Sequence, residues 1–340
     1  MTLDIRPFDE AEIDEYHELR LALYRHDFPE LPTPTREATV STLSRHGDRL
    51  LWTARRDQRV VGKVSVLLLD DNEHLAVVDV AVLPELRRQG IGTALLDFVL
   101  PHVRDRGCTV VEGGYVKLDG PGGSWTRNRG FREVQSTILQ ILELGEVDRA
   151  RWAVDTPEGY ELVRWRGHVP DELVASYAEA RRAIADAPWG ESAEHPPDWT
   201  VERVRRIEVE RREQGIDLRT VAAVDTHGTV VGLTEAEARP KDPTRLMQGD
   251  TVVLKAHRGH GLGVAMKAEL LRWFTAEHGA LEQAWTRTAA ANTYMADVNH
   301  RLGFATVGRY GAVAGPIGTI GSEFRPIVGS DGGNPDCYAG

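Results

Sequence analysis

Arg87-Arg-Gln-Gly90-Ile-Gly92 and Arg258-Gly-His-Gly261-Leu-Gly263 are the two stretches that decide the fold of this chain. Each comes after a strand-like run of valine and leucine, and each is followed by apolar residues at helical spacing. The first turn of a helix has unpaired N–H groups and a partial positive charge, and glycine lets a ligand approach its backbone. The pattern therefore predicts an anion site suited to a pyrophosphate, and the chain carries it twice.

Two further landmarks recur in the same order. Val60-Val-Gly62 returns as Val230-Val-Gly232, and Arg129-Gly130-Phe131 returns as Leu302-Gly303-Phe304. Each landmark of the second copy follows its counterpart by about 170 residues, which is half of the 340-residue chain. This spacing predicts a tandem duplication with a boundary near 145–160. We expect domains over 1–150 and 158–315, followed by an irregular tail over 316–340.

Each half shows the same kinds of element, read from the spacing of apolar residues. In the first half, strands are predicted over 3–7, 50–54, 60–69 and 75–83, and helices over 9–26 and 90–106. In the second half, strands are predicted over 160–165, 218–224, 229–236, 249–254, 283–288 and 304–310. Helices are predicted over 170–186, 200–213, 261–278 and 292–302, and residues after about 313 are expected to be irregular. The fold class is therefore α/β (α+β), with strands and inserted helices in each half.

Composition narrows the classes of function. The net charge of −11 disfavours nucleic-acid binding and suits a cationic substrate such as an amine. No run of about eighteen apolar residues predicts a membrane span, and the first ten residues do not resemble a secretory signal. Cys108 and Cys337 do not form a disulfide framework and are expected to be free thiols in a reducing cytoplasm. We expect a cytoplasmic monomer or homodimer.

Several kinds of site compete at the glycine-rich turns. A Walker loop needs Gly-Lys-Ser/Thr, and a dinucleotide fingerprint needs Gly-x-Gly-x-x-Gly; neither copy has either. A turn that binds no ligand is the alternative, and its recurrence after a strand and before a Gly-Phe pair makes it the weaker one. No cluster has metal-ligand spacing, so no metal is expected, and no Gly-x-Ser-x-Gly elbow supports a serine hydrolase.

The two glycine-rich stretches resemble motif A of the GCN5-related N-acetyltransferases, and Asn292 to Phe304 resembles their motif B. The tandem arrangement is similar to the mycothiol-synthase-like acetyltransferases of actinobacteria. This resemblance implies two tandem domains, each with a mixed, mostly antiparallel sheet flanked by helices, and acetyl-CoA as the cofactor. The cofactor contacts that it implies are Val252, Val253, Leu254, Arg258, Gly259, His260, Gly261, Leu262, Gly263, Val264 and Asn292, and in the first half Val82, Arg87, Arg88, Gln89, Gly90, Gly92 and Thr93.

The resemblance also implies catalytic roles. The cofactor would lie in a gap between two strands, and a backbone N–H near Val253 would hold the acetyl oxygen. Asp250 is the first choice to accept the proton of the amine, with Glu235 and Glu237 as substitutes. Asn299 stands at the position of the family's tyrosine acid, so Tyr294 or water is left to protonate the thiolate.

The two halves differ in these positions. Asp79 holds the place of Asp250 in the first half, but a Gly-Pro-Gly-Gly run replaces the start of motif B, and Thr126 stands at the tyrosine position. Such a run is a poor start for a helix. We therefore expect catalysis in the second half, with the first half binding cofactor without turnover or serving as a scaffold.

The leading hypothesis is an acetyl-CoA-dependent N-acetyltransferase acting on the primary amine of a small molecule, of the secondary-metabolite or antibiotic type. A non-catalytic acyl-CoA sensor is the alternative from another class. Acetylation of an amino sugar–cysteine conjugate, as in mycothiol synthesis, and acetylation of protein lysines also remain open.

Overall fold

The computed structural model describes residues 3–29, 31–43 and 49–321. The N half contains β1 (Asp4–Pro7), α1 (Ile13–Asp27), α2 (Arg36–Leu43), β2 (Arg49–Arg56), β3 (Arg59–Leu68), β4 (Leu75–Val82), α3 (Ile91–Arg104), β5 (Val110–Val116), α4 (Pro121–Asn128) and β6 (Arg132–Glu143). The C half contains β7 (Tyr160–Arg166), α5 (Val174–Arg181), the 3-10 helix η4 (Arg182–Asp186), α6 (Val201–Glu213), β8 (Asp217–Asp225), β9 (Val230–Arg239), β10 (Asp242–Val253), α7 (Leu262–Glu277), β11 (Gln283–Ala289), α8 (Thr293–Arg301) and β12 (Ala305–Pro316).

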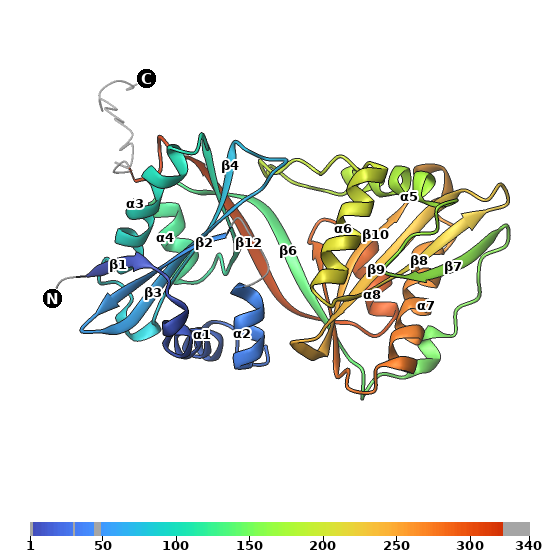
Figure 1. Cartoon of the computed structure of the whole chain (residues 1–340), viewed down its shortest axis with the longest axis horizontal. Helices are drawn as coiled ribbons and strands as arrows, with labels where there is room; N and C mark the ends of the chain where they lie inside the picture. The colour runs from blue at the N-terminus through green and yellow to red at the C-terminus, as the bar shows by residue number, and fades with distance from the viewer. Residues whose placement is uncertain (1–2, 30, 44–48, 322–340) are drawn as a thin grey trace, which may run out of the picture.

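The strands form one twelve-stranded sheet with the order β1-β2-β3-β4-β5-β12-β6-β11-β10-β9-β8-β7. The last strand of each half thus pairs with the other half: β12 lies between β5 and β6, and β6 lies between β12 and β11. Both strands run through the middle of the molecule from one half to the other (Figure 1). The two halves are joined by backbone hydrogen bonds along a continuous sheet.

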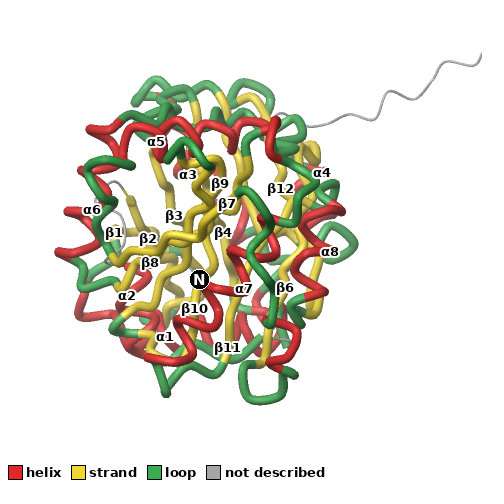
Figure 2. The backbone as a smooth tube through the Cα atoms, turned by 90° about the vertical axis from the view of Figure 1, so that its right-hand side faces the viewer, coloured by secondary structure: helices red, strands yellow, loops and turns green. Residues whose placement is uncertain are grey.

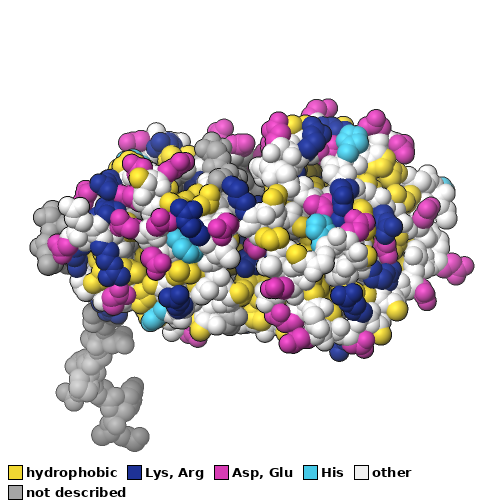
Figure 3. All heavy atoms as spheres, turned by 60° about the horizontal axis from the view of Figure 1, so that its bottom comes forward, with side chains coloured by type: hydrophobic (Ala, Val, Ile, Leu, Met, Phe, Trp, Pro, Cys, Tyr) yellow, Lys and Arg dark blue, Asp and Glu magenta, His cyan; other side chains and the backbone are white. Residues whose placement is uncertain are grey.

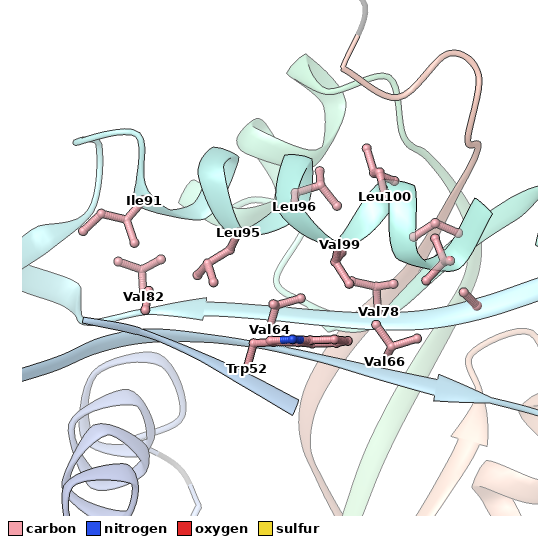
Figure 4. Packing of buried hydrophobic residues seen from close by; sticks show 14 of the residues in the cluster. Trp52, Val64, Val66, Val78, Val82, Ile91, Leu95, Leu96, Val99 and Leu100 are labelled. Carbon is pink, nitrogen blue, oxygen red and sulfur yellow. The ribbon is translucent and has the colours of Figure 1, made fainter. Parts of the chain in front are cut away.

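Helices cover both faces of this sheet. Viewed along the long axis, α2 and α6 lie on one side of the strands and α4 and α8 on the other (Figure 2). In the N half, α3 is amphipathic, and Ile91, Leu95 and Val99 point toward strand residues that include Val64 and Val82 (Figure 4). Each of these buried side chains contributes about 1.5–3 kcal/mol relative to an exposed one. This packing fixes the start of α3 against the end of β4.

A segment from each half also packs on the other. Between α1 and α2, Phe28 and Leu31 pack in a cluster with Trp285 of β11 and Met247 of β10. In return, the segment 188–195 crosses to the N half, where Glu191 N–H donates to the carbonyl of Val134 at 2.7 Å. The same segment places Ser192 Oγ 2.9 Å from Glu112 Oε1 on β5. The two crossings have matching places in the two halves, as a duplication predicts.

The mixed, mostly antiparallel α/β architecture confirms the expected fold class. Two expectations about local structure are wrong. A helix does begin within Gly-Pro-Gly-Gly, because Pro121 takes the first helical position, where its fixed φ fits and its missing N–H costs nothing. Residues 313–316 are not irregular, since β12 continues to Pro316. Residues 322–340 of the expected tail lie outside the described residues, and the boundary at 150 stays a prediction.

The spacing of apolar residues did not predict α2, α4, β5, β6 or the first seven residues of β10. Acidic and basic side chains are interspersed across both halves on the face that Figure 3 displays, so the negative net charge is not gathered there. Within the described ranges, no helix is long and apolar enough to cross a membrane.

Candidate functional site

The site is built around a gap between two parallel strands. β10 and β11 pair only over Arg245–Met247 with Gln283–Trp285, and beyond Met247 no pairing continues. At the open end lies a cavity of about 540 Å³. Its walls come from the end of β10, the glycine-rich turn, the starts of α7 and α8, and η4 with the two residues after it. The cavity therefore runs from the α7 and α8 face of the sheet to the opposite face, where η4 lies.

The glycine-rich turn supplies a row of free backbone donors. Gly261 precedes α7 with φ of +82°, a left-handed conformation that favours glycine. The first bond of the helix is from Ala265 N–H to the Gly261 carbonyl at 3.1 Å. Among the described residues, the N–H groups of residues 259–264 have no backbone acceptor. A Cβ on Gly263 would meet no atom within 4 Å, so the backbone is open to a ligand there.

Arg258 and Arg87, one in each glycine-rich turn, make hydrogen bonds to other parts of the protein. Arg258 Nε donates to the carbonyl of Val253 at 2.9 Å, and its Nη2 lies 2.5 Å from Asp186 of η4. Arg87 makes the same contacts, to the Val82 carbonyl at 3.1 Å and to Asp27 at 2.8 Å. Both guanidinium groups therefore tie the end of a strand to a helix on the opposite face. These side chains are therefore engaged within the protein, and the free polar groups of the C-half turn are those of its backbone.

The N half repeats the turn but covers it. Gly90 also has φ of +82°, and Ala94 N–H donates to its carbonyl at 2.9 Å. Here, however, the indole of Trp125 lies over the first turn of α3, 3.8 Å from the position of a Cβ on Gly92. Trp125 Nε1 also donates to Thr93 Oγ1 at 3.3 Å. The first turn of α3 is thus occupied by a side chain of α4, whereas that of α7 is open.

Arg88 and Gln89 are two other residues of the N half that the resemblance implies as cofactor contacts, and the structure gives each a conformational or structural role. Arg88 has φ of +65°, the left-handed conformation that Gly259 adopts in the C half at +85°. Gln89 Oε1 accepts a hydrogen bond from Arg56 Nη1 at 2.6 Å. The N-half turn is therefore less well suited to a ligand than its C-half counterpart.

The end of β10 presents a backbone donor to the gap. Leu254 N–H donates to the Val231 carbonyl of β9 at 2.9 Å. Because successive N–H groups of a strand point to opposite sides, the N–H of Val253 faces the gap. This is the orientation that the expected role at the acetyl oxygen requires.

Asp250 lies at an irregularity in β10. The register with β9 shifts between Gln248 and Thr251, so that Gly249 and Asp250 face one residue, Glu235. Such a bulge redirects a side chain. β4 pairs regularly with β3 over the matching residues, which include Asp79.

Asp250 is hydrogen-bonded to a network of buried side chains. Its Oδ2 accepts from Arg181 Nη2 at 2.8 Å, and its side chain is 41% exposed, whereas that of Arg181 is 9% exposed. Arg181 also hydrogen-bonds to Glu235 and to the Tyr177 hydroxyl, and its guanidinium stacks 3.6 Å from the Trp199 ring centroid. Two carboxylates thus share one guanidinium, which leaves the cluster with a net negative charge.

The surroundings shift the pKa values of Asp250 and Asp79 in opposite directions. Desolvation raises the pKa of Asp250, the charge of Glu235 adds to this, and Arg181 opposes it. Desolvation also acts on Asp79, but the ammonium of Lys63 outweighs it and lowers the pKa of Asp79. A carboxylate with a raised pKa is the better proton acceptor.

The motif B residues divide into two groups. Asn292 Oδ1 caps α8 by accepting from Met295 N–H at 3.2 Å, and Asn292 and Tyr294 both line the cavity. Tyr294 is 58% exposed. Asn299 is fully buried and donates to Gln140 Oε1 at 2.7 Å, so it stabilises the sheet from the α8 side. The structure places Tyr294, and not Asn299, in the wall of the cavity.

Of the other expected contacts in the C half, Val252, Val253, Arg258, Gly259, Gly261, Leu262 and Gly263 line the cavity. Sequence reasoning missed the wall formed by 183–188 and the network residues Tyr177 and Arg181. They come 70 to 81 residues before Arg258 and carry no pattern of their own, so only the packing of α5 and η4 on β9 and β10 brings them to the site.

The site thus combines a divergent strand pair, a row of free backbone N–H groups, and a carboxylate beside the gap. The acetyltransferase (GNAT) family model matches residues 13–117 and 181–304, and the chain belongs to that family. The tandem GNAT protein of the clavulanic acid biosynthesis pathway has a similar structure, with a TM-score of 0.74 and 25% identity over 93% of this chain and 99% of that one.

Two other proteins are similar to this chain. A GCN5-related N-acetyltransferase from Sphaerobacter thermophilus has a TM-score of 0.72 and 19% identity, over 93% of this chain and 96% of its own. Human N-acetyltransferase 8 is 35% identical over 94 residues, which are 26% of this chain and 41% of that protein. The chain spans less than half the length of this curated relative.

Proposed function

We propose that this protein transfers an acetyl group from acetyl-CoA to the primary amine of a small molecule, and that each chain uses one acetyl-CoA, bound in the C half. The observation that carries this proposal is the contrast between the two turns, open at Gly263 and covered by Trp125 at Gly92. The structural likeness to a tandem GNAT protein of clavulanic acid biosynthesis supports a secondary-metabolite or antibiotic-type acceptor.

Each part of the C half has a role in binding. The N–H groups of residues 259–264 hold the pyrophosphate at the start of α7, where the helix dipole favours negative charge. Asn292 directs its side-chain N–H groups to the pantetheine arm, since its oxygen already caps α8. Bound acetyl-CoA supplies an activated acyl group with a thiolate as the leaving group.

The remaining residues act on charge and protons. Asp250 accepts the proton that the amine loses, either directly or through a water, which makes the nitrogen nucleophilic. Val253 N–H donates to the acetyl oxygen as negative charge develops on it. Tyr294, in the cavity wall, or a water protonates the departing sulfur.

Calorimetric titration of acetyl-CoA into the wild type, Gly263→Val and Gly92→Val tests this proposal. The wild type should bind one equivalent. Gly263→Val should lose binding, because its side chain enters the open cradle, and Gly92→Val should keep it. Thermal melting of all three proteins checks that each is folded.

Loss of binding in Gly92→Val alone would reverse the assignment of the halves, and two equivalents in the wild type would contradict a single site. Release of CoA in the presence of amines then separates an enzyme from a sensor. A protein that binds acetyl-CoA and acetylates no amine is a sensor, and that result would overturn the proposed transfer.

A further inference from the structure

Arg287 differs from the other arginines around the gap. It lies on β11, its side chain is exposed, and among the described residues it has no hydrogen bond and no carboxylate partner. Nearby arginines are engaged: Arg245 pairs with Asp242 at 3.2 Å, and Arg309 donates to Ser136 at 2.8 Å. The guanidinium of Arg287 lies over the ring of Tyr115, at 5.1 Å from its centroid.

The exposed side chain of Arg287 lies beside protein groups that partly shield it from solvent. Solvent reaches its side chain, yet desolvation by the surrounding protein lowers its pKa. An arginine stays charged in a protein even so. A desolvated cation without a counter-ion is costly, and an anionic ligand would remove that cost.

The side chains along β11 place Arg287 on one face of the sheet. Ala284 packs in the cluster beneath α7, and Thr288 meets Asn299 of α8 at 3.4 Å. Trp285 faces the other way, and Arg287, two residues further on, shares its direction. Arg287 is therefore on the face that α5, η4 and α6 cover, opposite to the starts of α7 and α8.

Asp250 lies on the same face across the gap. Its partner Arg181 belongs to α5. Met247 and Trp285 form the last pair of β10 and β11, with Asp250 three residues beyond one and Arg287 two residues beyond the other. An acceptor that approaches from this face meets a carboxylate on one side of the gap and a free guanidinium on the other.

The N half has no equivalent of this pair. The last pair of β4 and β5 is Val77 with Glu112, so the residue that matches Arg287 is Gly114. Tyr115, over whose ring Arg287 lies, belongs to β5 of the N half; it has φ of +58°, and its ring centroid lies 5.8 Å from that of Tyr310. The surroundings of Arg287 thus come from both halves.

We propose that the acceptor is an amine that also carries a carboxylate, an amino-acid-like molecule, and that Arg287 binds this carboxylate while the amine lies at Asp250. This inference rests on the proposed transfer to a small amine. Arg287 binds and orients the acceptor, and takes no part in the proton transfer.

The test uses matched acceptors that differ only in the carboxylate. One series runs from glycine through β-alanine and 4-aminobutyrate to 6-aminohexanoate, and its partner series has the amides of the same acids. CoA release from acetyl-CoA is measured with the wild type, Arg287→Gln, Arg287→Lys and Arg245→Gln. Arg245 is the matched control, because it also stacks on a ring, that of Trp285 at 4.1 Å, but already has a carboxylate partner.

We expect the wild type to favour the acid series at one chain length. For that acid, Arg287→Gln should raise KM by about tenfold to a hundredfold, with a much smaller change in kcat. Arg287→Lys should recover part of the loss, and Arg245→Gln should behave as the wild type. For the amides, Arg287→Gln should change nothing.

Two failures have different meanings. Equal acetylation of acids and amides, with no effect of Arg287→Gln, overturns the carboxylate assignment and leaves the transfer intact. Acetylation of no amine in either series, by a protein that binds acetyl-CoA, overturns the proposed transfer and this inference with it.

Discussion

Asp250 and Asp79 occupy matching positions on β10 and β4, and their neighbours give them different properties. Lys63 pairs with Asp79 and lowers its pKa, so that carboxylate is a poor proton acceptor. Asp250 shares Arg181 with Glu235, and burial raises its pKa. The difference between the halves is therefore a difference of charge as well as of shape.

Asp250→Asn should lower kcat by about a hundredfold or more, the usual contribution of a general base. Because the pKa of Asp250 is raised, the wild-type rate should already fall at a pH above the ordinary range of an aspartate, as protonation removes the acceptor. The variant should lack this acidic limb. The measurement is the pH profile of kcat, with calorimetry to show that acetyl-CoA binding is unchanged.

Asp79→Asn is the control for this variant, since it removes a carboxylate at the matching position of the N half. Its kcat should stay within a few-fold of the wild type. An equal loss of kcat in both variants would show that the effect comes from the sheet and not from proton transfer at Asp250.

Lys267 is a buried lysine whose charged form is destabilised by desolvation. It lies on α7, is 1% exposed, and desolvation lowers its pKa to about 7. Leu96 holds the matching position on α3. Because the folded state binds the proton more weakly than the unfolded chain, stability should fall as the pH decreases from about 10 to about 7.

Lys267→Met should therefore raise the free energy of unfolding at pH 7 by on the order of 3 kcal/mol, and the gain should shrink toward pH 10. Denaturant unfolding at both values measures it. Lys255→Met removes the same charge from an exposed position and should change little. A stability gain that does not depend on pH would contradict a desolvated ammonium as the cause.

At the scale of elements, the sequence predicted those with a strong local pattern. The continuous apolar run 75–83 and the amphipathic run 90–106 correspond to β4 and α3, and the same holds for β9 and α7. The turn between them was readable because its glycines at 90 and 261 are required by the backbone conformation itself.

Helix α4 shows both a failure and a success of prediction from the local sequence pattern. Its start was judged poor because glycine and proline disfavour helix interiors, but Pro121 is at the first position, where proline is tolerated, and the helix continues through Gly122 and Gly123. The expected difference between the halves has a different physical basis. α4 is present, and it brings Trp125 onto the turn that a ligand would use.

At the scale of the molecule, the exchange of β6 and β12 has no local signature. Each strand ends its half of the chain, and its own pattern would suit pairing within that half equally well. Which half it joins depends on neighbours far along the chain: Gly311 of β12 pairs with Val116, and Thr288 of β11 pairs with Ile138. Likewise, the free Arg287 is recognisable only after every partner around it has been placed.

The exchange predicts that the halves do not fold separately. A fragment of residues 1–147 would leave β5 and β6 without the strand that lies between them, and a fragment of 148–340 would leave β11 and β12 without β6. Each would expose unpaired strand edges, which favour aggregation or pairing with a second copy. The intact chain should unfold in one cooperative transition, because neither half keeps a complete sheet once the other is lost.

Expression of the two fragments apart and together, followed by size-exclusion chromatography and thermal unfolding, tests this prediction. Apart, each should be insoluble or associated with copies of itself. Together, they should form a one-to-one complex that binds acetyl-CoA, because the exchanged strands cross between chains as readily as within one. A single fragment that is monomeric and unfolds cooperatively would show that its half can complete its own sheet, which would contradict a fold held together by exchanged strands.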